Sequence, residues 1–241
     1  MTSINLPSSQ LGLNISDPLD NMQPNYAIQM DNLIPDNSGD RVRKGFEQVC
    51  NNGYNVLTTV NREGSRKILA STNDIIDVYD VDDFETVEET KTGFGSEDWV
   101  GVPFTDGSGA VHTIIANGVD VPQDYTTSLN DVGFTIPTGV RLDRPLSFKN
   151  RLYFIGGDFD LYYGGVQSIS GSLTKFSMGS YFRQGGRILT IANWTQDAGD
   201  GVNDLLVVVS TEGEVLIYSG TSPEASDWAM VGVFRIPDRK S

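Results

Sequence analysis

Apolar runs alternate with polar turns most clearly in residues 203–236. Residues 205–209 form a continuous apolar run, which is typical of a strand buried on both faces. Gly213 predicts a tight turn after it, because glycine adopts positive φ at little cost. Residues 215–218 and 228–236 predict two further strands. A meander of three strands cannot bury both of its faces alone, so we expect it to stack on similar units.

Three other segments repeat this pattern of apolar run, polar turn and second apolar run ending in tyrosine: residues 67–79, 111–125 and 151–163. Their turns recur at Thr72, Asn117, Gly156 and Thr211, at intervals of about 45, 39 and 55 residues. Propeller blades repeat every roughly 40–50 residues. The longest interval contains a Gly/Ser-rich insertion at residues 164–186. The sequence therefore predicts an all-β fold, a β-propeller-like array of about four antiparallel blade units.

The N-terminal part differs from these repeats. Residues 1–20 are polar and contain prolines, which predicts an extended arm. Five apolar positions then share one face of a short helix that Pro35 ends: Tyr26, Ala27, Met30, Leu33 and Ile34. Residues 41–46 predict a strand, and residues 130–144 an irregular connection. We expect an arm at 1–20, a lead-in with the helix and strand at 21–50, and the propeller-like domain, with a complete or an incomplete ring, at 51–241.

Composition excludes several classes of protein. The formal net charge is −15 with a pI of about 4.3, which argues against a nucleic-acid clamp or an anionic membrane surface. The single cysteine, Cys50, excludes an intrachain disulfide framework. No apolar run reaches the roughly 18 residues of a membrane span. The N-terminus lacks the basic and apolar regions of a signal peptide, so we expect folding in the cytosol.

Two pieces near the N-terminus read Asn-Tyr-Ala-Ile-Gln-Met-Asp-Asn-Leu-Ile-Pro at 25–35 and Arg-Val-Arg-Lys-Gly-Phe at 41–46. They resemble the opening of a family of tail proteins of short-tailed bacteriophages, and further pieces match that family in chain order. The later pieces lie at 116–125, 148–154, 176–179, 185–186, 194–204, 211–223 and 228–234, so the resemblance covers nearly the whole chain. It implies a structural protein of the virion, similar to the nozzle or tail-tube component below the portal and adaptor. Such proteins contain β-propeller-like domains and assemble as six-fold rings.

The resemblance also implies partners and a location. We expect other copies of this chain in a six-fold ring, the portal and adaptor, other tail proteins, and double-stranded DNA passing through the lumen without specific binding. The protein would be assembled in the host cytoplasm and reside in the virion tail. A lumen lined with carboxylates repels phosphates, so DNA slides through it. The acidity is equally consistent with a role in keeping the free subunit soluble. Whether the blade units close into a ring within one chain stays open.

Apolar residues of the N-terminal arm are candidate assembly contacts: Leu6, Leu11, Leu13 and Ile15. In a stack of rings, such an arm would pack against an adjacent subunit or an adjoining ring. In the competing interpretation, the arm is the outermost strand of the protein's own sheet.

Chemical motifs are sparse, so we expect a protein that is not an enzyme and has no catalytic residue, cofactor or metal. Residues 197–204 place three carboxylates in a glycine-rich loop, and carboxylate oxygens suit Ca²⁺. Gly199 and Gly201, however, occupy positions where an EF-hand loop has ligands, so a turn capped by aspartates explains the loop without metal. The only histidine, His112, lies in an alternating strand pattern and is expected to be structural.

The alternative function is a carbohydrate-binding or glycan-cleaving propeller module of the tail. Four aromatic residues could line a sugar-binding groove: Tyr153, Phe154, Tyr162 and Tyr163. Because side chains alternate along a strand, at least half should point into the core, which favours core packing. A cluster of aromatics and carboxylates converging on one pocket would support this alternative.

Overall fold

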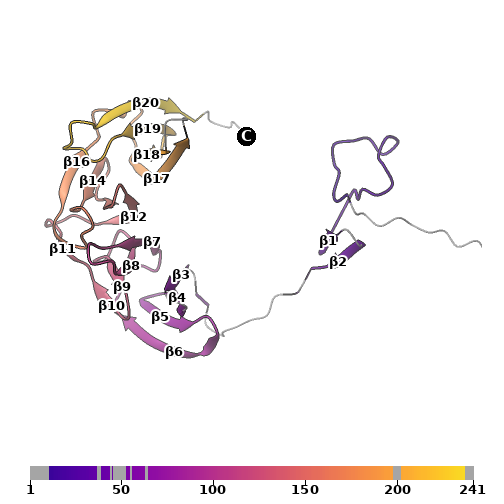
Figure 1. Cartoon of the computed structure of the whole chain (residues 1–241), viewed down its shortest axis with the longest axis horizontal. Coiled ribbons are helices and arrows are strands. Elements are labelled where there is room, and N and C mark those ends of the chain that lie inside the picture. Colours follow the sequence, from indigo (N-terminus) through magenta and orange to yellow (C-terminus); the bar gives the residue numbers. More distant parts are fainter. Residues whose placement is uncertain are drawn as a thin grey trace, which may run out of the picture. The chain divides into compact units, whose positions relative to one another are not determined.

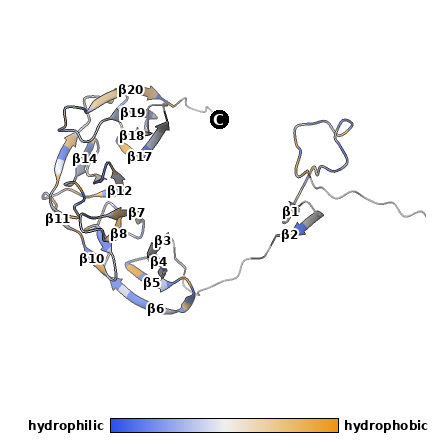
Figure 2. Ribbon diagram, viewed as in Figure 1, coloured by the Kyte–Doolittle hydropathy of each residue, from blue (hydrophilic) through white to orange (hydrophobic). Residues whose placement is uncertain are grey.

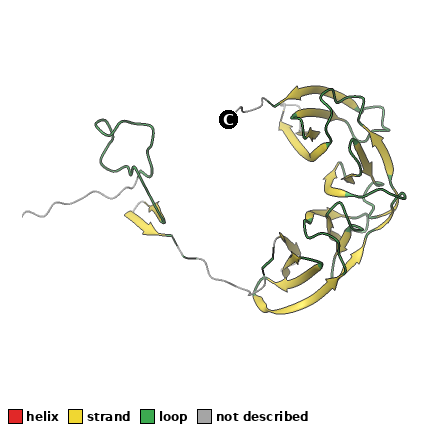
Figure 3. Cartoon of the chain, turned by 180° about the vertical axis from the view of Figure 1, so that it is seen from behind, coloured by secondary structure: helices red, strands yellow, loops and turns green. Residues whose placement is uncertain are grey.

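The computed structural model describes residues 11–36, 39–43, 45, 53–54, 56–62, 65–197 and 202–236. These residues form strands, turns and loops, and none of them is helical (Figure 3). Contacts divide the chain into two compact units, Met1–Val49 and Cys50–Ser241. The expected all-β class is therefore confirmed.

The first unit contains one hairpin, formed by β1 (Leu33–Asp36) and β2 (Gly39–Val42), which are antiparallel. Next to it, the backbone of residues 11–14 pairs with that of residues 25–27. Leu11 N–H donates to the Asn25 carbonyl over 3.1 Å, and Leu13 forms a parallel bridge with Ala27. The three apolar core clusters of the protein contain only residues from Val60 onward. The described part of the first unit therefore has no share in them.

The short helix expected from Tyr26 to Ile34 is wrong. Asn32 has a φ of 57°, in the left-handed region where a helix cannot continue, and Leu33 begins β1. The apolar side chains that suggested a helical face have no core to cover. Leu33 and Ile34 are exposed, and the other three are only half-buried. A helix of this length is only marginally stable without such packing.

The second unit contains four sheets of four antiparallel strands each (Figure 1). The first sheet has β3 (Val56–Arg62), β4 (Ser65–Thr72), β5 (Ile75–Asp80) and β6 (Asp83–Thr92). The second has β7 (Val100–Thr105), β8 (Val111–Ala116), β9 (Gln123–Tyr125) and β10 (Leu129–Asp131). The third has β12 (Asp143–Phe148), β13 (Arg151–Ile155), β14 (Asp160–Tyr163) and β16 (Thr174–Ser177). The fourth has β17 (Ile188–Asp197), β18 (Val202–Ser210), β19 (Glu214–Ser219) and β20 (Ala229–Arg235).

The hairpins expected from the repeated pattern are confirmed. They are β4–β5, β8–β9, β13–β14 and β18–β19, and each supplies the two central strands of its sheet. The expected meander in residues 205–234 is also present, with Leu206 opposite Tyr218 and Val215 opposite Phe234. The pattern did not reveal β17, the first strand of the last sheet. The glycine-rich insertion contributes β15 (Ser170–Ser172), which pairs in parallel with β11 (Gly133–Thr135).

Successive sheets of the second unit contact each other through their first strands. β3 contacts β7, β7 contacts β12, and β12 contacts β17. Figure 1 shows these four strands on the concave side of an open arc, with the sheets in chain order. The described sheets form a row rather than a closed ring.

Three apolar clusters fill the three junctions of this row. Successive side chains of a strand point to opposite faces, so one strand contributes to two junctions. Tyr153 lies in the cluster between the third and fourth sheets, and Phe154 lies in the cluster between the second and third. The four aromatics considered for a sugar groove, Tyr153, Phe154, Tyr162 and Tyr163, are at most 6% exposed. Their expected core packing is confirmed.

Candidate functional site

The last sheet of the row has two apolar faces. Its inner face covers the cluster shared with the third sheet and carries Ile191, Leu206, Val208, Leu216 and Tyr218. The residues between these point to the opposite side of the sheet. On that side the strand register aligns Val209, Val215 and Phe234 on neighbouring strands. Residues 205–209 were expected to be buried on both faces. Leu206 and Val208 are fully buried, whereas Val207 and Val209 are only half-buried.

We call the second side of this sheet the outer face and define it by Trp194, Val207, Val209, Val215 and Phe234. Trp194 is 48% exposed and Phe234 is 54% exposed, whereas Val207, Val209 and Val215 are half-buried, and Leu205 and Ile217 on the same side are buried. None of the five belongs to an apolar cluster among the described residues. Contiguous exposed apolar residues on a soluble protein mark an interaction surface more often than scattered ones do.

The edge strand β20 is apolar on both sides: Phe234 belongs to the outer face, whereas Met230 and Val233 lie opposite Tyr218 and Leu216 of the inner face. Its exposed residues include Met230, Val231 and Val233, and Figure 2 shows the strand largely in hydrophobic colours. At the other end of the row, the edge strand β6 is hydrophilic in the same view. Two charges of β6 reach the second sheet: Lys91 Nζ lies 2.9 Å from Asp131, and Glu89 accepts the N–H of Leu129. An exposed apolar edge strand such as β20 readily pairs with another chain.

A glycine lets Phe234 lie flat on the outer face. Gly232 is next but one to Phe234 on β20, and a Cβ added to it would come within 2.9 Å of the Phe234 ring. Any other residue at 232 would therefore push the ring away from the sheet. The local sequence thus fixes the position of the most exposed aromatic side chain on this face.

The assembly residues expected in the N-terminal arm are partly described. Leu6 lies outside the described residues. Leu11, Leu13 and Ile15 are 49%, 53% and 82% exposed, so their side chains are accessible for contacts. Within residues 11–20, no strand joins any of the four sheets of the second unit. A role of the arm in assembly stays a prediction.

The expected metal-free loop at 197–204 lies mostly outside the described residues. At its edge, the Asp204 carboxylate accepts the Thr195 hydroxyl over 2.8 Å and lies 3.6 Å from Lys149 Nζ. The described residues contain no cluster of histidine, cysteine and carboxylate side chains suited to a metal ion.

His112 is a buried strand residue of β8, as expected. Its Nδ1 lies 2.9 Å from the Asp124 carboxylate, and its Nε2 lies 3.4 Å from Asp106. A hydrogen bond from the Ser108 hydroxyl lowers the pKa of Asp106 to about 2, while burial raises the pKa of Asp124. With both ring nitrogens beside carboxylates, His112 ties the end of β7 to β9.

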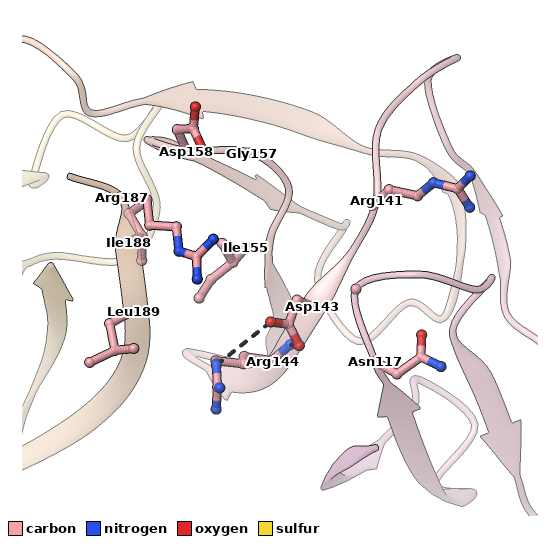
Figure 4. A pocket seen from close by; sticks show the side chains of 11 residues that line it. Asn117, Arg141, Asp143, Arg144, Ile155, Gly157, Asp158, Arg187, Ile188 and Leu189 are labelled. Atoms are coloured by element: carbon pink, nitrogen blue, oxygen red, sulfur yellow. Dashed lines mark hydrogen bonds and ion pairs between the residues drawn. The ribbon is translucent and has the colours of Figure 1, made fainter. Parts of the chain in front are cut away.

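A cavity of about 310 Å³ lies beside β12 and β17, with the turns after β8 and β13 along its wall (Figure 4). Three arginines and two aspartates line it: Arg141, Arg144, Arg187, Asp143 and Asp158. Sequence reasoning missed it, because Arg144 lies in the connection expected to be irregular and Arg187 follows the insertion. Aromatic residues are absent from its lining, so it lacks the stacking surface of a sugar site.

No model of a known protein family matches the chain, and no curated protein matches it. Among solved structures, the chain is similar to a crystal structure of BBS1N in complex with ARL6DN, soaked with mercury. The identity is 12% over 83% of this chain and 73% of that one, with a TM-score of 0.36. A second structure of BBS1N in complex with ARL6DN, soaked with lead, is 12% identical over 71% of this chain and 65% of that one, with a TM-score of 0.35. Likeness at this level carries no argument on function. A helix suited to crossing a membrane is not found in the described part of the chain.

Proposed function

We propose that this chain is a structural subunit of a short bacteriophage tail, a nozzle or tail-tube component below the portal and adaptor. In this role it forms part of the channel through which DNA is ejected. The ordered resemblance of its sequence pieces to that family suggests the role. The observation that carries the proposal is the outer face of the last sheet, which is apolar and unpartnered among the described residues.

The arrangement of the sheets supports a propeller-like array. In a propeller, four-stranded blades stand around a central channel. Four such sheets follow one another here, and their first strands are the ones that meet. We take the four sheets as blade units whose stacking continues beyond the row.

The occupant that we assign to the outer face is a sheet of a second copy of this chain. All three junctions within the row bury apolar faces of neighbouring sheets against each other. A sheet of a second copy would continue the same stacking, and a head-to-tail contact of this kind generates a ring when its rotation closes. Six copies would form the ring, with Leu6, Leu11, Leu13 and Ile15 as further contacts to a neighbour or an adjoining tail ring.

The charge of the chain suits a DNA channel. With a net charge of −15, a ring of such subunits repels phosphate groups, so double-stranded DNA passes without being held. The alternative of a carbohydrate-binding or glycan-cleaving module gains no support from the described surface. Its candidate aromatics are buried, and the arginine-lined cavity has no aromatic wall.

Native mass spectrometry and electron microscopy of the purified chain test the proposal. The expected result is a six-fold ring built from 26.3 kDa subunits. A chain that stays monomeric at every concentration and binds glycans on an array would contradict it and favour the carbohydrate module.

A further inference from the structure

Arginines line the cavity beside β12 and β17, although the protein as a whole is acidic. The chain has 17 lysines and arginines against 32 acidic residues, yet three arginines and two aspartates line this one cavity. The arginines of this cavity offset its aspartates, whereas acidic residues outnumber basic ones in the chain as a whole.

Arg187 has a fixed backbone and a free side chain. Its N–H donates to the Thr211 hydroxyl over 3.2 Å, its carbonyl accepts the Thr211 N–H over 2.9 Å, and the next N–H, of Ile188, donates to the Asp158 carbonyl. Figure 4 shows its guanidinium directed toward the middle of the cavity. Among the described residues, no hydrogen bond or ion pair of this guanidinium is found, and the Asp158 side chain lines the same cavity. The donors of the Arg187 guanidinium are therefore available to a ligand.

Arg144 is held in an unusual backbone conformation at the start of β12. Its φ is 46°, and the pairing of β12 with β13 is irregular between Asp143 and Leu146. Asp143 accepts the backbone N–H of Arg144 over 2.7 Å, and its second oxygen lies 3.6 Å from Arg144 Nε. Irregular pairing of this kind re-aims a side chain. Left-handed residues other than glycine cluster at functional sites because the conformation is strained.

A glycine opposite Asp143 makes this arrangement possible. Gly118 has a φ of 71°, and a Cβ added to it would come within 3.2 Å of the Asp143 Cβ. Asp143 therefore packs directly against the backbone of Gly118, and in this position its carboxylate contacts Arg144. Within the described chain, this ion pair is the one side-chain contact found for Arg144, whose side chain is 41% exposed.

Arg141 differs from the other two arginines although it lines the same cavity. Its guanidinium donates a hydrogen bond to the Val119 carbonyl. Figure 4 shows this guanidinium pointing away from Arg187 and Asp143. The side chain of Arg141 is therefore held by the backbone, and Arg141 provides a matched control for Arg144 and Arg187.

We propose that Arg144 and Arg187 together bind an oxyanion, the phosphate or carboxylate group of a small molecule. Planar guanidinium groups match both anions by paired hydrogen bonds, and two of them on one cavity wall favour a doubly charged group. The cavity volume lies at the lower end of the range for small-molecule sites. A long polyanion such as nucleic acid is disfavoured because the remaining surface carries the net charge of −15.

Calorimetric titration of the full chain with inorganic phosphate and, separately, with citrate tests this proposal. Chloride keeps the ionic strength constant, and the two anions distinguish a phosphate site from a carboxylate site. We expect saturable binding of at least one anion. Arg187→Gln and Arg144→Gln should each weaken it at least about tenfold, whereas Arg141→Gln should change it less than about twofold.

Circular dichroism melting shows whether each variant is folded, and Arg187→Lys provides a milder change at the same position. That variant keeps the charge but loses the paired geometry, so we expect an intermediate affinity. Absence of saturable binding by both anions would overturn the proposal, as would an equal loss in Arg141→Gln. A short DNA duplex that binds more tightly than either anion, and loses that binding in Arg187→Gln, would overturn the assignment to a small molecule. These measurements do not depend on ring assembly, so their failure leaves the proposed tail function untouched.

Discussion

The two faces of the last sheet have similar sequences and different surroundings. Val208 and Val209 are neighbours on β18, but Val208 is fully buried on the inner face and Val209 is half-buried on the outer face. The inner face meets the third sheet, and the outer face meets no apolar cluster of the described chain. The strands of this sheet are therefore patterned for two neighbours, of which the described fold supplies one.

The largest difference between the faces should appear in stability. Val208→Ala removes two buried methyl groups and should lower the free energy of unfolding by roughly 2–3 kcal/mol. Val209→Ala makes the same change in the same strand and should cost about 1 kcal/mol or less in the monomer. Denaturant melts of dilute protein compare the two. Equal losses would show that the outer face is already covered within one chain.

A smaller effect is expected at the edge of the inner face. The buried carboxylate of Glu214 on β19 accepts the backbone N–H groups of Arg183 and Gln184, at distances down to 2.8 Å. Glu214→Gln turns an amide donor toward these donors and should lower the unfolding free energy by about 1–2 kcal/mol. The exposed Glu212→Gln is the control and should stay within about 0.5 kcal/mol. If Glu214→Gln leaves the unfolding free energy unchanged, the carboxylate does not stabilise the loop at Arg183 and Gln184.

The smallest expected effect is an increase in stability, at Tyr218. The Tyr218 hydroxyl is buried on the inner face without a hydrogen-bond partner among the described residues, and burial raises its pKa. Removing an unsatisfied hydroxyl relieves a desolvation cost, so Tyr218→Phe should raise the unfolding free energy by roughly 0.5–1 kcal/mol. Thermal melts against Tyr181→Phe, an exposed tyrosine, measure the change. A clear loss of stability would show that the hydroxyl has a partner, such as a buried water.

Much of the second unit could be predicted from local patterns. The turns near Thr72, Asn117, Gly156 and Thr211 separate apolar runs long enough for strands, so alternation and turn chemistry identified the central hairpin of each four-stranded sheet. The helix at Tyr26–Ile34 failed because five apolar positions satisfied a helical period without a core to bury them.

The candidate sites required three-dimensional information. An apolar run such as 205–209 indicates that both faces are apolar but does not show which face lacks a neighbour. Arg144 lies in β12 and Arg187 directly precedes β17, so their place in one cavity depends on the stacking of β12 against β17. The backbone irregularity that aims Arg144 has no sequence signal, since arginine rarely adopts a positive φ.

Native mass spectrometry of the outer-face variant Trp194→Ser/Phe234→Ser tests the central claim most directly. The control is Val121→Ser/Val166→Ser, which makes two polar substitutions at exposed apolar residues elsewhere. If a second copy covers the outer face, the wild type and the control form the ring, whereas the outer-face variant stays a folded monomer with near-normal melting. A ring that forms unchanged in the outer-face variant would contradict the account.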